Sequence, residues 1–168
     1  GALALLFAPI ASAQEITEED FLAAFGEDHA AVVALTDEVG RAEAESAEVL
    51  VLTHCEEEGL SKQDAAAIDK GLGGSLRELL QSKEFEGKAG EILVYHTNGK
   101  VPAKRLLLVG LGKKKDLTLD VIRQALGHAV KRVRQAKSGF FTASIPAFMP
   151  KEHSLIEVAQ AMVEGAIL

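Results

Sequence analysis

The sequence contains no tryptophan, only 5% aromatic residues, four prolines and a single cysteine among 168 residues. With so few aromatic side chains, the core must be built from aliphatic residues, a mixture typical of helices that cover a sheet. The lone Cys55 cannot form a disulfide within the chain, and the carboxylates that follow it disfavour its thiolate. Apolar residues still make up 48% of the chain, so its composition and length favour one folded domain rather than a disordered chain.

The sequence also lacks an apolar run long enough to span a bilayer as a mature segment. Residues 2–10 are apolar and precede Ala11-Ser12-Ala13, which together resemble the hydrophobic region and cleavage site of a secretory signal. No methionine or basic stretch comes before them. We therefore expect residues 1–13 to be a signal-peptide remnant of an exported or periplasmic protein. The alternative is a short apolar helix or arm that packs on the body of the protein.

Charge is distributed unevenly along the chain. Residues 14–69 carry 16 acidic and 2 basic side chains, whereas residues 70–168 carry 9 acidic and 16 basic ones. The acidic part would repel phosphate at long range unless it faced away, so the balance disfavours a nucleic-acid partner. The basic residues on one face of the helix expected after Leu117 are most simply solvated surface, with a contact between subunits or domains as the alternative.

The apolar pattern predicts strands that alternate with helices through the second half of the chain. Strand-like runs occupy residues 30–35, 48–55, 91–97, 104–112 and 139–148. Helical patterns occupy residues 17–25, 61–82, the segment after Leu117 and residues 153–168, and glycines divide the second of these into two short helices. Together they predict an α/β fold with a mixed sheet flanked by helices on both faces.

The strongest candidate site is the glycine-punctuated turn between residue 108 and the following helix. Gly110 and Gly112 could turn backbone amides towards a phosphate, with Lys113 beside them and two further lysines up to Lys115. The turn lacks the third glycine of the dinucleotide fingerprint and the Gly-Lys-Ser/Thr ending of the P-loop. The pattern therefore favours a tight strand-to-helix connection with solvated lysines, and a phosphate loop at Gly110, Gly112 and Lys113 is the alternative.

Other chemistry finds little support in the spacing of the residues. No two histidines have the i, i+4 spacing that places two imidazoles on one helical face, and no nucleophile elbow or paired carboxylates can be identified. His54 and Cys55 are neighbours on an expected strand, so their side chains should point to opposite faces. We therefore assign no catalytic residue and no metal ligand within the chain. The histidines are His29, His54, His96, His128 and His153.

Several stretches, taken as a set, resemble the N-terminal domain of the leucyl aminopeptidases, the cytosol aminopeptidases of peptidase family M17. The resemblance covers residues 47–168, and no single stretch would suffice. Its motifs are Asp69-Lys70 with Gly73-Gly74, Phe85-x-Gly87-Lys88-x-Gly90-Glu91, Val109-Gly110-Leu111-Gly112-Lys113, and Glu164-Gly165.

The resemblance implies a macro-domain-like fold without catalytic residues, which helps to build a hexamer and frames access to the active site. In the family, catalysis belongs to a C-terminal domain that holds two divalent metals, zinc or manganese. This chain ends at Leu168, where such a domain would begin, so we expect the catalytic domain to be absent and to be a partner of this one. Most family members are cytoplasmic, which is the alternative to export.

Three segments and two functions follow from these observations. Residues 1–13 form the leader, residues 14–46 form an extension with a helix and a first strand, and residues 47–168 form the macro-like domain. The favoured function is the non-catalytic domain of a metalloaminopeptidase that releases N-terminal amino acids from peptides. The alternative is a free-standing module that binds ADP-ribose or another nucleotide through residues 110–115.

Overall fold

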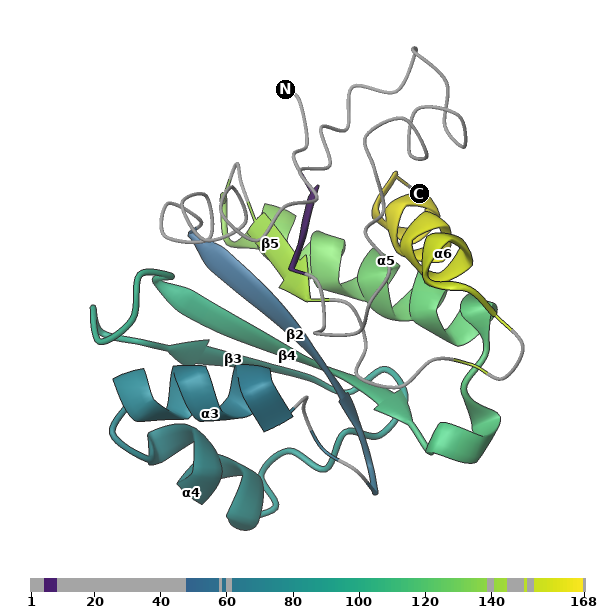
Figure 1. Cartoon of the computed structure of the whole chain (residues 1–168). Coiled ribbons are helices and arrows are strands. Elements are labelled where there is room, and N and C mark those ends of the chain that lie inside the picture. Colours follow the sequence, from purple (N-terminus) through teal and green to yellow (C-terminus); the bar gives the residue numbers. More distant parts are fainter. Residues whose placement is uncertain are drawn as a thin grey trace.

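A computed structural model describes residues 5–8, 48–57, 59, 62–138, 141–144, 150 and 153–167 of the chain. Five strands and their connecting helices make up this part (Figure 1). In chain order the elements are β1 (Leu5–Ala8), β2 (Val49–Cys55), α3 (Lys62–Gly71), α4 (Ser75–Gln81), β3 (Ile92–His96), β4 (Arg105–Gly112), the 3-10 turn η1 (Lys114–Asp116), α5 (Leu119–Gln135), β5 (Phe141–Ser144) and α6 (Leu155–Ile167).

The strands form one mixed sheet in the order β1-β5-β2-β4-β3. Strands β1, β5, β2 and β4 pair in parallel, whereas β3 runs antiparallel to β4. Because β3 is reversed, the loop that enters it lies at the same edge of the sheet as the carboxyl ends of β2 and β4. Ligands of open α/β sheets bind at that edge, so this is where a site is expected.

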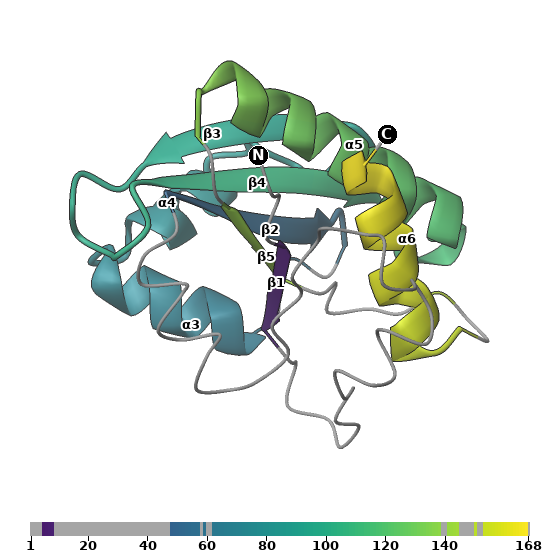
Figure 2. The ribbon, with the colours of Figure 1, turned by 90° about the horizontal axis from the view of Figure 1, so that it is seen from above.

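Helices cover both faces of the sheet, as the sequence predicts (Figures 1 and 2). Helices α5 and α6 lie on one face, over a core that includes Val51, Leu107 and Val109. Helices α3 and α4 lie on the other face, where Leu72 and Leu76 pack with strand residues such as Leu52. The large aliphatic share of the sequence thus fills two separate core layers.

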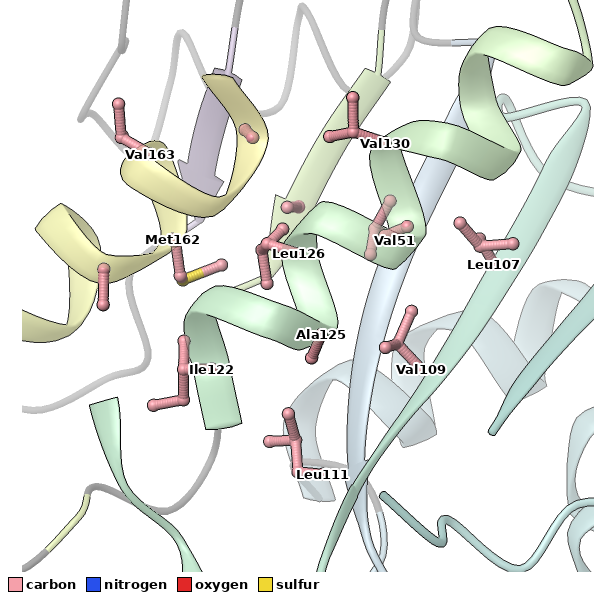
Figure 3. Packing of buried hydrophobic residues seen from close by; sticks show 14 of the residues in the cluster. Val51, Leu107, Val109, Leu111, Ile122, Ala125, Leu126, Val130, Met162 and Val163 are labelled. Atoms are coloured by element: carbon pink, nitrogen blue, oxygen red, sulfur yellow. The ribbon is translucent and has the colours of Figure 1, made fainter. Parts of the chain in front are cut away.

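Helix α5 shows how the local sequence determines its element. Thr118 caps the helix, because its hydroxyl accepts a hydrogen bond from the amide of Val121 at 3.2 Å. Every apolar residue of the expected face is buried, and Figure 3 shows several of them between α6 and the sheet. The buried residues are Ile122, Ala125, Leu126, Ala129, Val130 and Val133.

Most expected elements are confirmed, with one addition. Glycines divide the helical pattern of residues 61–82 into α3 and α4, and the other strand and helix predictions from residue 48 onward are matched by β2, β3, β4, α5, β5 and α6. The addition is β1, a strand that lies beside β5 and forms within the leader-like stretch of the sequence. The helix of residues 17–25 and the strand of residues 30–35 lie outside the described residues. No helix among those described is long and apolar enough to cross a membrane.

Candidate functional site

The carboxyl edge of β2 and β4 is occupied by a loop of the chain itself. Residues 85–91 lead into β3 and contact the end of β4 at residues 110–112, with His54 near the end of β2. We call these residues together the glycine-loop junction. It unites two of the sequence motifs that carry the family resemblance, which lie at least 18 positions apart in the sequence.

Backbone hydrogen bonds close the junction. The amide of Gly110 donates to the carbonyl of Glu91 at 2.8 Å, and the amide of Gly112 donates to the carbonyl of Gly87 at 2.8 Å. In return, the amide of Gly90 donates to the carbonyl of Gly110 at 3.2 Å. The two amides that a phosphate loop would turn towards a ligand are therefore both engaged with protein carbonyls.

The glycines are required because the two segments approach each other so closely. A Cβ on Gly110 would lie 2.0 Å from the carbonyl oxygen of Lys88, and one on Gly87 would lie 2.2 Å from Nδ1 of His54. Gly112 and Gly87 also have positive φ angles of 76° and 80°, a region that favours glycine. The glycine pattern is thus explained by backbone packing, without a ligand.

The carboxylate of Glu91 stabilises the loop from within. Its Oε2 accepts hydrogen bonds from the amides of Glu86 at 3.1 Å and Lys88 at 3.0 Å. Amides on either side of a glycine with positive φ form a concavity that suits an anion, and here the anion is a side chain of the same loop. Glu86 and Lys88 also form an ion pair, which lowers the pKa of Glu86 and raises that of Lys88.

His54 lies beneath this loop and is only 7% exposed. Its ring meets that of Phe85 edge to face, with centroids 5.3 Å apart, and its Nδ1 has no hydrogen-bond partner among the described residues. Burial lowers the pKa of His54, and the nearby negative charge of Glu91 opposes this effect in part. Burial under this loop therefore favours the neutral form of the His54 imidazole.

We expect the stability of the fold to fall as the pH is lowered through the titration range of His54. The unfolded chain, with a histidine pKa of about 6.5, takes up this proton more readily than the folded one. The contribution is present above pH 6.5 and is lost as the pH falls towards the folded pKa. The slope from this one proton cannot exceed about 1.4 kcal/mol per pH unit.

Urea unfolding of the wild type and the His54→Leu variant between pH 5 and 8 measures this effect. The difference in the free energy of unfolding between the two proteins should change with pH below 6.5 and be flat above it. His96→Gln, at an exposed histidine, serves as the control for the loss of a histidine side chain. An identical pH dependence in the wild type and His54→Leu would show that His54 is not the titrating group.

The sequence candidates Gly110, Gly112 and Lys113 lie together where β4 ends. Lys113 is exposed and precedes η1, and Lys115 is also exposed. Sequence reasoning did not find the contact of His54 with Phe85 and Gly87. The alternation along β2 was the available signal, because it places His54 on the same face as Leu52. His54 and Cys55 do point to opposite faces, since Cys55 packs with the α5 layer.

The other two motifs form close packing contacts as well. Asp69 is buried, and its carboxylate accepts a hydrogen bond from the backbone amide of Arg77. The same carboxylate forms an ion pair with the guanidinium of Arg77 at 3.1 Å. Glu164 pairs with Arg123 at 2.7 Å, and Gly165 lets α6 approach the backbone of α5 at that point. Among the described residues, no group of three or more His, Cys, Asp or Glu side chains could hold a metal ion.

Comparison with solved structures identifies other proteins with this fold. Macrodomains and a bottromycin maturation enzyme share the fold. The macrodomain of Mycobacterium tuberculosis DarG aligns with a TM-score of 0.56 at 15% identity, over 71% of this chain and 80% of that one. The bottromycin maturation enzyme BotP aligns with a TM-score of 0.52 at 17% identity, over 72% of this chain and 22% of that one. At these identities the likeness shows the fold alone.

Relatives found by sequence identify the family, whereas the structural matches show only the fold. A probable cytosol aminopeptidase of Geobacter sp. (strain M21) is 44% identical over 100 residues, and one of Alkaliphilus metalliredigens (strain QYMF) is 35% identical over 102 residues. Each alignment covers 60% of this chain and 20% of the relative, so the chain matches about a fifth of the length of these relatives. Residues 32–168 match the model of the N-terminal domain of the cytosol aminopeptidase family. The chain therefore belongs to this family, as its N-terminal domain.

Proposed function

We propose that this chain is the non-catalytic N-terminal domain of a leucyl aminopeptidase-type metalloexopeptidase. The observation that carries the proposal is that the residues of the family motifs form contacts within the domain itself. The glycines at residues 110 and 165 mark close backbone contacts, Gly87 marks a close contact with the His54 ring, and Glu91 and Asp69 accept backbone hydrogen bonds. A domain whose distinguishing residues are engaged in its own packing serves as a scaffold rather than as a reaction centre.

The activity then belongs to the parent protein. The parent releases N-terminal amino acids from peptides, and two divalent metals, zinc or manganese, activate the attacking water in a C-terminal catalytic domain. The present domain contributes to the assembly of a hexamer and limits access to the active site. The relatives, about five times longer than their aligned segments, are named as aminopeptidases, which supports this division of labour.

We expect the purified chain to show no hydrolysis of a leucyl amide with Mn²⁺ or Zn²⁺, and no rise in melting temperature with ADP-ribose or ATP. The first result follows if the carboxylates that hold the metals belong to another domain. The second follows because the amides of Gly110 and Gly112 already donate to Glu91 and Gly87. Release of leucine and thermal melts, measured on one preparation, check both.

Two outcomes would contradict the proposal. The first is hydrolysis that a chelator abolishes and that a mock preparation lacks, which would place a catalytic centre in this chain. The second is a ligand-dependent rise in melting temperature, because ligand at 100 times its dissociation constant stabilises a native state by about 2.7 kcal/mol. Simultaneous replacement of Lys113, Lys114 and Lys115 by alanine then shows whether a nucleotide bound at this turn.

The second candidate function, a free-standing nucleotide or ADP-ribose module, is favoured by the macrodomain-like fold. It requires the loop of residues 85–91 to leave the carboxyl edge, which breaks the hydrogen bonds from Gly110 and Gly112. Export of the parent remains part of our proposal on the strength of residues 1–13. Cleavage after Ala13 would remove β1 and leave β5 without this neighbour.

A further inference from the structure

Strand β3 forms one edge of the sheet. It pairs with β4 on one side, and no described element lies on its other side (Figures 1 and 2). An edge strand presents unpaired N–H and C=O groups, which form a template for another strand. The question is therefore whether β3 is protected against such pairing or suited to it.

The register defines which backbone groups are free. Gly110 donates to the carbonyl of Glu91, and Thr97 donates to the carbonyl of Lys104, so residues 91 and 97 both turn their polar groups towards β4. In an antiparallel ladder this orientation alternates along the strand. The N–H and C=O groups of Ile92, Val94 and His96 therefore point outwards.

The strand itself lacks three features that commonly protect an edge. Residues 92–95 are Ile, Leu, Val and Tyr, without a lysine, a proline or a bulge. Their side chains are half-buried on both faces of the sheet, with Ile92 and Val94 on the α5 side and Leu93 and Tyr95 on the α3 side. A neighbouring strand would cover apolar surface on both faces at once.

The free groups are self-complementary about Val94. When β3 of a second copy is placed antiparallel to it, Val94 faces Val94, and Ile92 faces His96 at both ends. All three outward residues then exchange both of their hydrogen bonds across the edge. From this match we propose that β3 is a homotypic docking edge, through which a second copy of this chain extends the sheet across a two-fold axis.

Charge is compatible with this arrangement. His96 is the one imidazole of β3, and the pairing places it opposite Ile92 and close to Glu91 of the second copy. No like charges come to lie directly opposite each other. The Glu91 carboxylate itself is bound to the amides of Glu86 and Lys88 within its own loop. The two-fold arrangement also uses both β3 edges, so assembly through this strand ends at the dimer.

A strand pair of five residues is a small interface, so the dimer should be reversible and depend on concentration. The measurement is sedimentation equilibrium of the full chain at about 5 to 500 µM. This concentration range suits the micromolar dissociation constants of weak interfaces. The wild type should pass from monomer to dimer within it. Val94→Pro removes the outward N–H of each copy while leaving the hydrogen bonds to β4 intact.

The control is Val94→Ala, which loses the same side chain but keeps the N–H. Val94→Pro should weaken dimerisation by about tenfold or more relative to Val94→Ala, since two hydrogen bonds are lost and two carbonyls are left unpaired. Circular dichroism must show both variants folded. His96→Pro with His96→Ala repeats the comparison at an exposed side chain, so that a folding defect at residue 94 leaves the proposal testable.

Three results would overturn the proposal. One is a wild-type monomer throughout the concentration range. Another is a dimer that both proline variants retain as strongly as their alanine controls, which would place the interface elsewhere. The third is open-ended growth with concentration that both proline variants abolish, which would indicate an open rather than a two-fold contact through β3. The proposed function does not depend on this edge and would survive any of them.

Discussion

Replacing Gly110 by alanine should lower the free energy of unfolding by about 3 kcal/mol, the upper part of the range for overpacked sites. The added Cβ would lie 2.0 Å from the carbonyl oxygen of Lys88 and 2.6 Å from the carbonyl carbon of Gly87. Both are backbone atoms, so no rotation of a side chain can relieve the contact. Relief requires the loop of residues 85–91 to move away from β4, which breaks the hydrogen bonds that close the junction.

Urea unfolding of Gly110→Ala, with Gly99→Ala as the control, measures this effect. Gly99 has a φ of 76° but no atom within 4 Å of an added Cβ, so its replacement tests backbone strain alone. That strain should cost about 1 kcal/mol, the lower end for a residue held in a sparsely populated region. A Gly110→Ala protein as stable as the control would show that the junction opens at little cost.

The second large effect is expected where α6 crosses α5. A Cβ on Gly165 would lie 2.1 Å from the backbone oxygen of Arg123, so Gly165→Ala must push the helices apart. Alanine stabilises a helix by about 1 kcal/mol relative to glycine, which offsets part of the loss. We expect a net loss of about 2 kcal/mol, because overpacking costs up to about 3 kcal/mol.

Gly127 on the facing helix provides a matched control for Gly165→Ala. Its added Cβ would lie 3.2 Å from the oxygen of Gly165, a tight contact that a small shift relieves. Gly127→Ala gains the same helix propensity and should be close to neutral. Thermal unfolding of the two variants compares them directly. A melting temperature of Gly165→Ala equal to or above that of Gly127→Ala would show that close approach of the helices is not the reason for the glycine at position 165.

Local patterns in the sequence were sufficient to predict most of the described elements but not their contacts. The face of α5 could be predicted residue by residue, because a helical period is a local property and six apolar positions follow it. The break between α3 and α4 follows equally from its glycines. Strand β1 was missed because the apolar stretch of residues 2–10 has no alternation that separates a strand from a leader.

The candidate site could be predicted only in part, since the sequence identified its glycines but not what they contact. The sequence indicated that Gly110 and Gly112 are special, but a glycine is needed equally where a ligand approaches and where another segment approaches. Only the fold shows that the approaching group is the loop of residues 85–91. The burial of His54 under that loop likewise depends on pairing between distant segments, which local spacing does not encode.

The contacts of the glycine-loop junction also have a consequence for the order of folding. The hydrogen bonds that join Gly87 to Gly112 and Glu91 to Gly110 fall within residues 85–112, which also contain the β3–β4 hairpin. Pairing of β2 with β4 instead joins residues more than fifty positions apart and must close a long loop first. Residues 85–112 can therefore form as an early local unit, a template on which β2, with His54, docks before α5 and α6 complete the fold.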